Sequence, residues 1–238
     1  MKFSFQRLIA ASGGLVVVLT GQLLLAQTPS APPAPEAPKF VVVLVAAHGG
    51  SDFGAKIGNQ AEKDLTLSMS VKLRSLLMAR GIYVVTTRES DANINPDRRA
   101  EIANHANAAA CLDLHAAQAS GKNAPAVHLF LSSLPAAKHA GLTPWRTAQS
   151  ASIRRSMTLA GTLNSALTQT GVPVTLGRAP LATVDSMTCP AVAVEIAMQP
   201  AQDGGNDSGF ESKVLDAVAA AILEWRADGA QLNGVRQP

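Results

Sequence analysis

A strand that ends at a histidine is predicted by the segment Val41-Val42-Val43-Leu44-Val45-Ala46-Ala47-His48-Gly49-Gly50. Five β-branched or leucine residues in succession are typical of a strand that is buried on both faces of a sheet. In sheets with helices on both faces, ligands bind in the crevice beyond the carboxyl ends of the strands. The segment therefore predicts an α/β fold in which His48 lies where a ligand binds.

Two later apolar segments are followed by polar side chains in the same way. His115 follows the strand predicted from Cys111, and Glu195 follows the strand predicted from Ala191. Two imidazoles and a carboxylate at strand ends are groups that metal sites and acid/base sites use, so we interpret them as one site. We interpret the other histidines as structural or solvated side chains: His105, His128 and His139.

A metal held by two histidines requires a further carboxylate near the same edge of the sheet. Glu62 is the leading candidate, because it lies in the first turn of the helix predicted after the His48 loop. The alternative is that Asn59 and Glu62 form a capping box, in which the glutamate serves only the helix terminus. Spacing favours neither interpretation. Asp64 is another candidate carboxylate, and Asp113 is a candidate hydrogen-bond partner of the site.

The remaining segments alternate between strands and helices. Leucine and methionine recur at helical spacing from Leu65 to Leu77, and a strand follows at residues 82–87, which predicts a βαβ unit of a parallel sheet. Asn95-Pro96 opens a second helix with asparagine as its N-cap. Other segments are predicted as helices at residues 151–170 and 210–225, a strand at 126–131, a long loop at 132–149, and an irregular segment or short strand at 174–184.

The first 38 residues differ in composition from the rest of the chain. Lys2 and Arg7 precede an uncharged apolar stretch from Leu8 to Ala26, which is typical of an export signal. We expect residues 1–26 to be a signal peptide or membrane anchor, 27–38 a Pro/Ala-rich linker, 39–226 a single folded domain, and 227–238 a disordered tail. The protein is then exported to the periplasm or cell envelope, and it contacts the membrane only if the N-terminal segment stays uncleaved.

Charge and composition argue against a nucleic-acid partner. The formal net charge is +3, but Lys2 and Arg7 are two of the 20 basic residues, so 18 basic residues remain against 17 acidic residues once residues 1–26 are set aside. Aromatic residues make up only 4% of the chain, too few for a surface on which bases stack.

Cys111 and Cys189 are the two cysteines of the chain. Both precede polar residues of the proposed site by a few positions, so in parallel strands both thiols lie toward the end of the sheet that is opposite the site. Measured along the strand direction from the proposed site, the positions of the two cysteines differ by about 7 Å at ~3.3 Å per residue. The sequence is therefore equally consistent with a disulfide and with two buried free thiols.

Five short segments resemble the zinc-dependent N-acetylmuramoyl-L-alanine amidases of the amidase-3 type, both in their order and in their approximate spacing. The similarity runs from about Phe40 to Trp225. The segments are His48-Gly49-Gly50, Glu62-Lys63-Asp64, Arg99-Ala100-Glu101-Ile102-Ala103-Asn104, Leu114-His115-Ala116 and Pro190-Ala191-Val192-Ala193-Val194-Glu195.

The resemblance implies a single domain with a mixed, largely parallel twisted sheet flanked by helices on both faces. It also implies one Zn²⁺ ion held by His48, Glu62 and His115, a catalytic role for Glu195, and a structural role for Arg99. The implied reaction is hydrolysis of the amide bond between N-acetylmuramic acid and L-alanine of the stem peptide. The implied partner is therefore peptidoglycan or a muropeptide, and the sequence leaves open whether an activator protein takes part.

Three departures from the family pattern keep alternatives open. Val45-Ala46-Ala47 replaces the usual Asp-Pro-Gly before the first histidine, Ala117 replaces an asparagine, and Ala197-Met198 replaces a step resembling Gly-Phe. None of the departures removes a proposed ligand. The alternatives are a catalytically impaired peptidoglycan-binding protein and another zinc amidohydrolase or carboxypeptidase that acts on cell-wall peptides.

Overall fold

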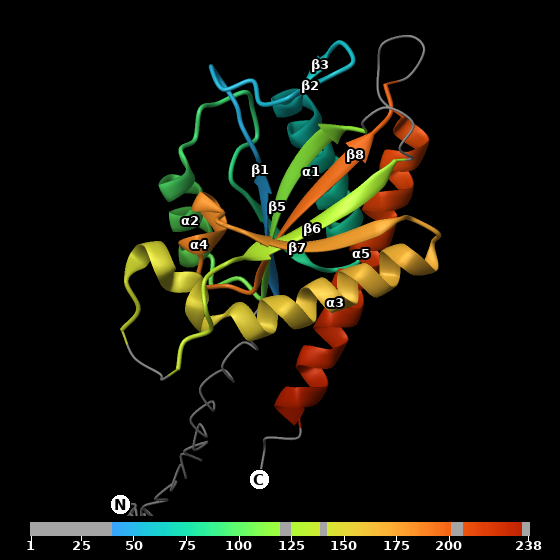
Figure 1. Cartoon of the computed structure of the whole chain (residues 1–238). Coiled ribbons are helices and arrows are strands. Elements are labelled where there is room, and N and C mark those ends of the chain that lie inside the picture. Colours follow the sequence, from blue (N-terminus) through green and yellow to red (C-terminus); the bar gives the residue numbers. More distant parts are fainter. Residues whose placement is uncertain (1–39, 120–124, 139–141, 201–206, 235–238) are drawn as a thin grey trace, which may run out of the picture. The chain divides into compact units, whose positions relative to one another are not determined.

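The computed structural model describes residues 40–119, 125–138, 142–200 and 207–234 (Figure 1). The expected signal peptide or anchor at residues 1–26 and the expected linker at residues 27–38 lie outside the described residues, so both remain predictions. Among the described helices, none is long and apolar enough to cross a bilayer.

A six-stranded mixed sheet organises the described domain, with the strand order β4-β1-β5-β8-β6-β7. The strands β4, β1, β5 and β8 are parallel to one another, whereas β6 is antiparallel to β8 and parallel to β7. The mixed, largely parallel sheet implied by the resemblance is confirmed. The bounds are β1 (Val41–Ala46), β4 (Tyr83–Thr86), β5 (Ala110–Gln118), β6 (Ala126–Ser132), β7 (Val174–Ala179) and β8 (Ala191–Met198).

Helices cover both faces of this sheet (Figure 1). The larger apolar core lies between one face and the helices α1 (Glu62–Met78), α3 (Ile153–Gln169) and α5 (Ser208–Gly234). A smaller core lies between the other face and the helices α2 (Pro96–His105) and α4 (Ala182–Asp185). The short elements are the hairpin of β2 (Lys56–Ile57) and β3 (Gln60–Ala61) and the 3-10 helix η1 (Trp145–Ala151).

His115 and Glu195 lie inside their strands, not at the strand ends where we predicted them. The strands β5 and β8 stay in register as far as Gln118 and Met198, three residues beyond the two polar side chains. The reason is that the backbone ladder between neighbouring strands continues whatever the polarity of one side chain. The two polar groups therefore lie on a face of the sheet and not in a loop.

Other boundaries also differ from the prediction. The helix α5 runs to Gly234, so residues 227–234 of the expected disordered tail are helical, because a helix that is already anchored by packing extends with one hydrogen bond per added residue. Of the two alternatives for residues 174–184, the strand is confirmed as β7, whereas the start of α4 within this segment was not predicted. The start of α2 is confirmed, with Pro96 as its first residue and the Asn95 side chain accepting a hydrogen bond from Arg98 N at 2.8 Å.

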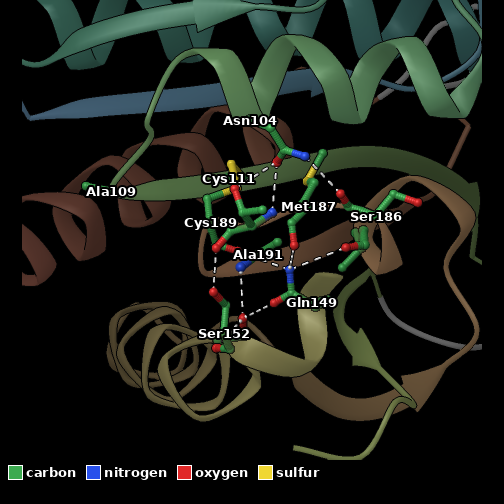
Figure 2. The surroundings of a disulfide bond; sticks show 12 residues. Asn104, Ala109, Cys111, Gln149, Ser152, Ser186, Met187, Cys189 and Ala191 are labelled. Atoms are coloured by element: carbon green, nitrogen blue, oxygen red, sulfur yellow. Dashed lines mark hydrogen bonds between the residues drawn. A yellow bond between two sulfur atoms is a disulfide. The ribbon is translucent and has the colours of Figure 1, made fainter. Parts of the chain in front are cut away.

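Figure 2 shows that Cys111 and Cys189 form a disulfide, which resolves the alternatives that the sequence left open. Their Cα atoms are 6.1 Å apart, and the bond ties β5 to the segment that leads into β8. The buried Gln149 side chain holds the same segment, because its Nε2 donates hydrogen bonds to Met187 O and Cys189 O, both at 3.0 Å. These contacts fix the start of the strand that carries Glu195.

Candidate metal centre

Three consecutive residues after β1 have left-handed backbone conformations. The φ angle is 60° at His48, 133° at Gly49 and 61° at Gly50. Glycine adopts positive φ at little cost, whereas a residue with a Cβ atom pays roughly 1–2 kcal/mol there. His48 is therefore held in a strained turn, and its ring lies against the carboxylate of Glu62.

Two buried arginines hold this turn through its carbonyl oxygens. Both donate to Ala46 O, Arg88 from Nε at 3.0 Å and Arg99 from Nη1 at 2.8 Å. Arg88 Nη2 also donates to Ala47 O at 3.0 Å, and Arg99 Nη2 donates to His48 O at 2.7 Å. The turn is thus fixed by hydrogen bonds even without the Asp-Pro-Gly sequence found in the amidases that this chain resembles.

The carboxylate of Glu62 lies between the two imidazoles. Its Oε2 is 3.0 Å from His48 Nε2, and its Oε1 is 2.9 Å from His115 Nδ1. The N-cap of α1 is Ala61, without a side-chain cap, so the capping-box alternative is wrong. Asp64, the other candidate carboxylate, is exposed and lies outside this group. One ligand atom from each of His48, Glu62 and His115 lies within 4.8 Å of the others, so the group can hold a metal ion.

Each imidazole has a second carboxylate on its other nitrogen. His48 Nδ1 lies 2.8 Å from Asp52 Oδ2, and His115 Nε2 lies 3.5 Å from Asp113 Oδ2. A carboxylate on one ring nitrogen keeps the proton there and leaves the other nitrogen for a metal. The nitrogens available to a cation are therefore Nε2 of His48 and Nδ1 of His115.

Glu195 lies beside this group but is not part of it. It is the register partner of His115 on the neighbouring strand, so both side chains project from the same face of the sheet. Glu195 is half-buried, and its carboxylate has no hydrogen bond or ion pair with other residues in the part of the chain that the structure describes. The carboxylate is thus available to exchange a proton with a ligand.

The sequence between residues 42 and 224 matches the family model Amidase_3, N-acetylmuramoyl-L-alanine amidase. The chain belongs to this family. The germination-specific N-acetylmuramoyl-L-alanine amidase of Bacillus subtilis (strain 168) is 32% identical to this amidase-family chain over 89 residues. That match covers 32% of the chain and 38% of the relative, so it spans less than half of the relative's length.

Solved amidase structures share the fold of this amidase-family chain. The catalytic domain of CwlV, an N-acetylmuramoyl-L-alanine amidase from Bacillus (Paenibacillus) polymyxa var. colistinus, has a TM-score of 0.61 at 20% identity, over 79% of this chain and 98% of that one. The amidase AmiC2 of Nostoc punctiforme has a TM-score of 0.63 at 22% identity, over 80% of this chain and 99% of that one. The expected α/β domain is therefore that of amidase catalytic domains.

The charged groups of the site shift one another's pKa values in the metal-free protein. Burial by itself lowers the pKa of His115, but the carboxylates of Asp113 and Glu62 outweigh burial and raise this pKa to about 10. Burial raises the pKa of Glu62, but the hydrogen bonds from His115 and Ala55 N outweigh it, and the net shift is downward. Two carboxylates thus stabilise a cation at His115, and a metal ion that binds there displaces the proton.

Three residues that support this candidate site were not identified from the sequence. Asp52 and Arg88 are polar residues in or beside loops, with no motif that marks them. Gly54 has a φ of 65°, and a Cβ atom there would lie 2.6 Å from both Glu62 Oε2 and His48 Cδ2. Only a glycine fits this position, and only the folded structure shows why.

Proposed function

We propose that the chain is a zinc-dependent hydrolase that cleaves the amide bond between N-acetylmuramic acid and L-alanine of the peptidoglycan stem peptide. The observation that carries the proposal is the convergence of His48, Glu62 and His115 in a chain whose residues 42–224 match the N-acetylmuramoyl-L-alanine amidase family. Glu195, on the next strand and the same face, is the proposed catalytic residue.

The donor set fits zinc. Two imidazole nitrogens and one carboxylate are the ligands of many catalytic zinc sites, which leave the fourth position open. Zinc bound by His48, Glu62 and His115 would make a coordinated water acidic, with a pKa near ~7, and would polarise the carbonyl of the substrate. Asp52 and Asp113 would orient the two imidazoles through their other nitrogens.

In the proposed reaction, Glu195 carries out the proton transfers. Its carboxylate accepts the proton of the attacking water and then donates it to the nitrogen of L-alanine as the amide bond breaks. The carbon–nitrogen bond is replaced by a carbon–oxygen bond, so the lactyl group leaves as a carboxylic acid and the stem peptide leaves with a free amine. The free carboxylate of Glu195 suits both transfers, because it has no partner among the described residues that would have to be displaced.

Mass spectrometry of purified muropeptides, incubated with the zinc-loaded protein, tests the reaction. We expect stem peptides with a free L-alanine amine, and no release after treatment with a chelator. Glu195→Gln should retain zinc and lower kcat by at least ~100-fold, the usual contribution of a general acid–base residue. The matched control is Glu224→Gln, which changes an exposed glutamate on α5. An unchanged kcat in Glu195→Gln would remove Glu195 from this role.

The same assay separates the two alternatives. A carboxypeptidase would release a C-terminal residue and leave the lactyl amide intact, whereas an impaired wall-binding protein would bind muropeptides without releasing any fragment. The family supports a site of action at the cell wall. We place the catalytic domain at residues 39–226 and propose export to the periplasm or cell envelope, a proposal supported by the basic and apolar composition of residues 1–26.

A further inference from the structure

A row of four polar side chains crosses the sheet from the candidate metal centre to the edge strand β7. His115 on β5 is the register partner of Glu195 on β8, Glu195 is the partner of His128 on β6, and His128 is the partner of Thr175 on β7. Register partners on neighbouring strands project from the same face. Figure 1 shows the four strands side by side in this order. The row therefore continues the proposed active site across four of the six strands of the sheet.

The row lies on the face that α2 and α4 share. Cys111 and Ala191 alternate onto this face along β5 and β8, and they belong to the smaller core with α2 and α4. The four side chains of the row are not covered by that core, because His115, Glu195 and His128 are half-buried and Thr175 is exposed. A ligand can reach all four from solvent.

One nitrogen of the His128 ring has a protein partner, and the ring also lies near that of Phe130, with the centroids 6.4 Å apart. Its Nδ1 lies 2.6 Å from Thr175 Oγ1, which fixes the plane of the imidazole. Within the described ranges, Nε2 makes no hydrogen bond or ion pair with the protein. A half-buried imidazole with one nitrogen anchored and the other open is arranged to hydrogen-bond a ligand.

We propose that His128, anchored by Thr175, binds an acceptor oxygen of the stem peptide while the scissile amide lies at the metal centre. This inference rests on the proposed function. Two strand spacings of ~4.8 Å place β6 about 10 Å from β5, which carries the proposed ligand His115, so His128 lies outside the ligand set. An extended peptide covers that distance with about three residues at ~3.3 Å each, so the second or third stem residue reaches His128. We assign the contact to the peptide part, because an extended stem can follow a row of this length.

Binding measurements in the Glu195→Gln background test the proposal without turnover. With a muropeptide whose stem has four residues, His128→Ala should raise Kd about tenfold, the loss that one hydrogen bond produces. His128→Gln keeps a donor and should recover most of the affinity, and Thr175→Val should cause a smaller loss. The matched control is His105→Ala, because His105 is exposed on α2 and its Nδ1 lies 2.9 Å from the carbonyl oxygen of Glu101, within its own helix.

The length of the stem decides which part of the substrate His128 contacts. With N-acetylmuramoyl-L-alanine, whose stem ends at the first residue, His128→Ala should leave Kd unchanged. An equal loss for both ligands would place the contact on the sugar and overturn the proposal. An unchanged Kd for the long stem, or a loss of zinc from the variant, would also overturn it.

Kinetics with a wild-type Glu195 complete the test. His128→Ala should raise KM about tenfold for the four-residue stem and leave kcat within about twofold, because the lost contact is made in the ground state as well as in the transition state. A lower kcat with an unchanged KM would assign His128 to the chemical step instead. If the zinc-loaded protein binds muropeptides but releases no peptide, the proposed function is wrong and the inference about His128 can still hold. If the protein releases peptides and His128→Ala binds the long stem normally, the inference about His128 is wrong and the proposed function still holds.

Discussion

Replacement of Gly54 by alanine should disrupt metal binding at the candidate centre. A Cβ atom at this position would lie 2.6 Å from Glu62 Oε2, and ordinary contact begins at 3.4 Å, so the carboxylate must move by about 0.8 Å. Metal sites tolerate about 0.2 Å in ligand distance. We expect zinc affinity to fall about 10- to 100-fold, or about 1.4–2.7 kcal/mol, as measured by competition with a chelating dye.

Gly81→Ala is the matched control for this substitution. Gly81 has a φ of 72°, close to the 65° of Gly54, but a Cβ atom there would meet nothing within 4 Å. Both variants should lose roughly 1–2 kcal/mol of unfolding free energy in urea, because both place a side chain at positive φ. Only Gly54→Ala should lose zinc. If both variants bound zinc equally well, Glu62 would not be held where the structure places it.

Three further predictions concern the stability of the domain. Arg99→Lys should lower the free energy of unfolding by about 2–4 kcal/mol, because one ammonium group cannot donate to all the carbonyl oxygens that the guanidinium group bridges. The control is Arg98→Lys at an exposed position, which should change this free energy by less than about 0.5 kcal/mol. Equal losses of the two variants in urea would contradict the role of Arg99. The raised pKa of His115 gives the metal-free protein a stabilising contribution that is present below pH 6.5 and is lost as the pH rises through about 10. Thermal unfolding in the presence of a chelator should therefore show that Tm falls across this pH range, whereas zinc affinity should rise because the ring must lose its proton to bind the metal. A Tm that increased toward pH 10 would refute this coupling. Replacing Cys111 and Cys189 together by alanine should lower the free energy of unfolding, measured in urea, by about 3–5 kcal/mol, because the disulfide closes a loop with a sequence separation of 78. A loss below about 1 kcal/mol would show that packing alone holds β8 in place.

Much of the fold followed from local pattern. The apolar run from Val41 predicted β1, the helical spacing from Leu65 to Leu77 predicted α1, and Asn95-Pro96 predicted the first residue of α2. These features are encoded in contiguous residues, because burial and capping repeat with the period of the element. The reversal of β6 and β7 relative to the other strands has no such local signature.

The site was only partly accessible from the sequence. The strand pattern selected His48 and His115, and resemblance to the amidase family implied that both bind a metal together with Glu62. Spacing left the role of Glu62 open until the structure placed its carboxylate between both imidazoles. Asp52 and Gly54 carry no motif, since their importance comes from the His48 ring and the Glu62 carboxylate that they contact.

Residue types and their order along the chain were therefore sufficient for an α/β domain, its buried strands and a set of candidate ligands. The distances within the site, the disulfide and the row from His115 to Thr175 came only from the folded chain. The physical reason is that periodicity describes neighbours in sequence, whereas a binding site depends on which strands pair and in which register, and packing between distant segments sets both.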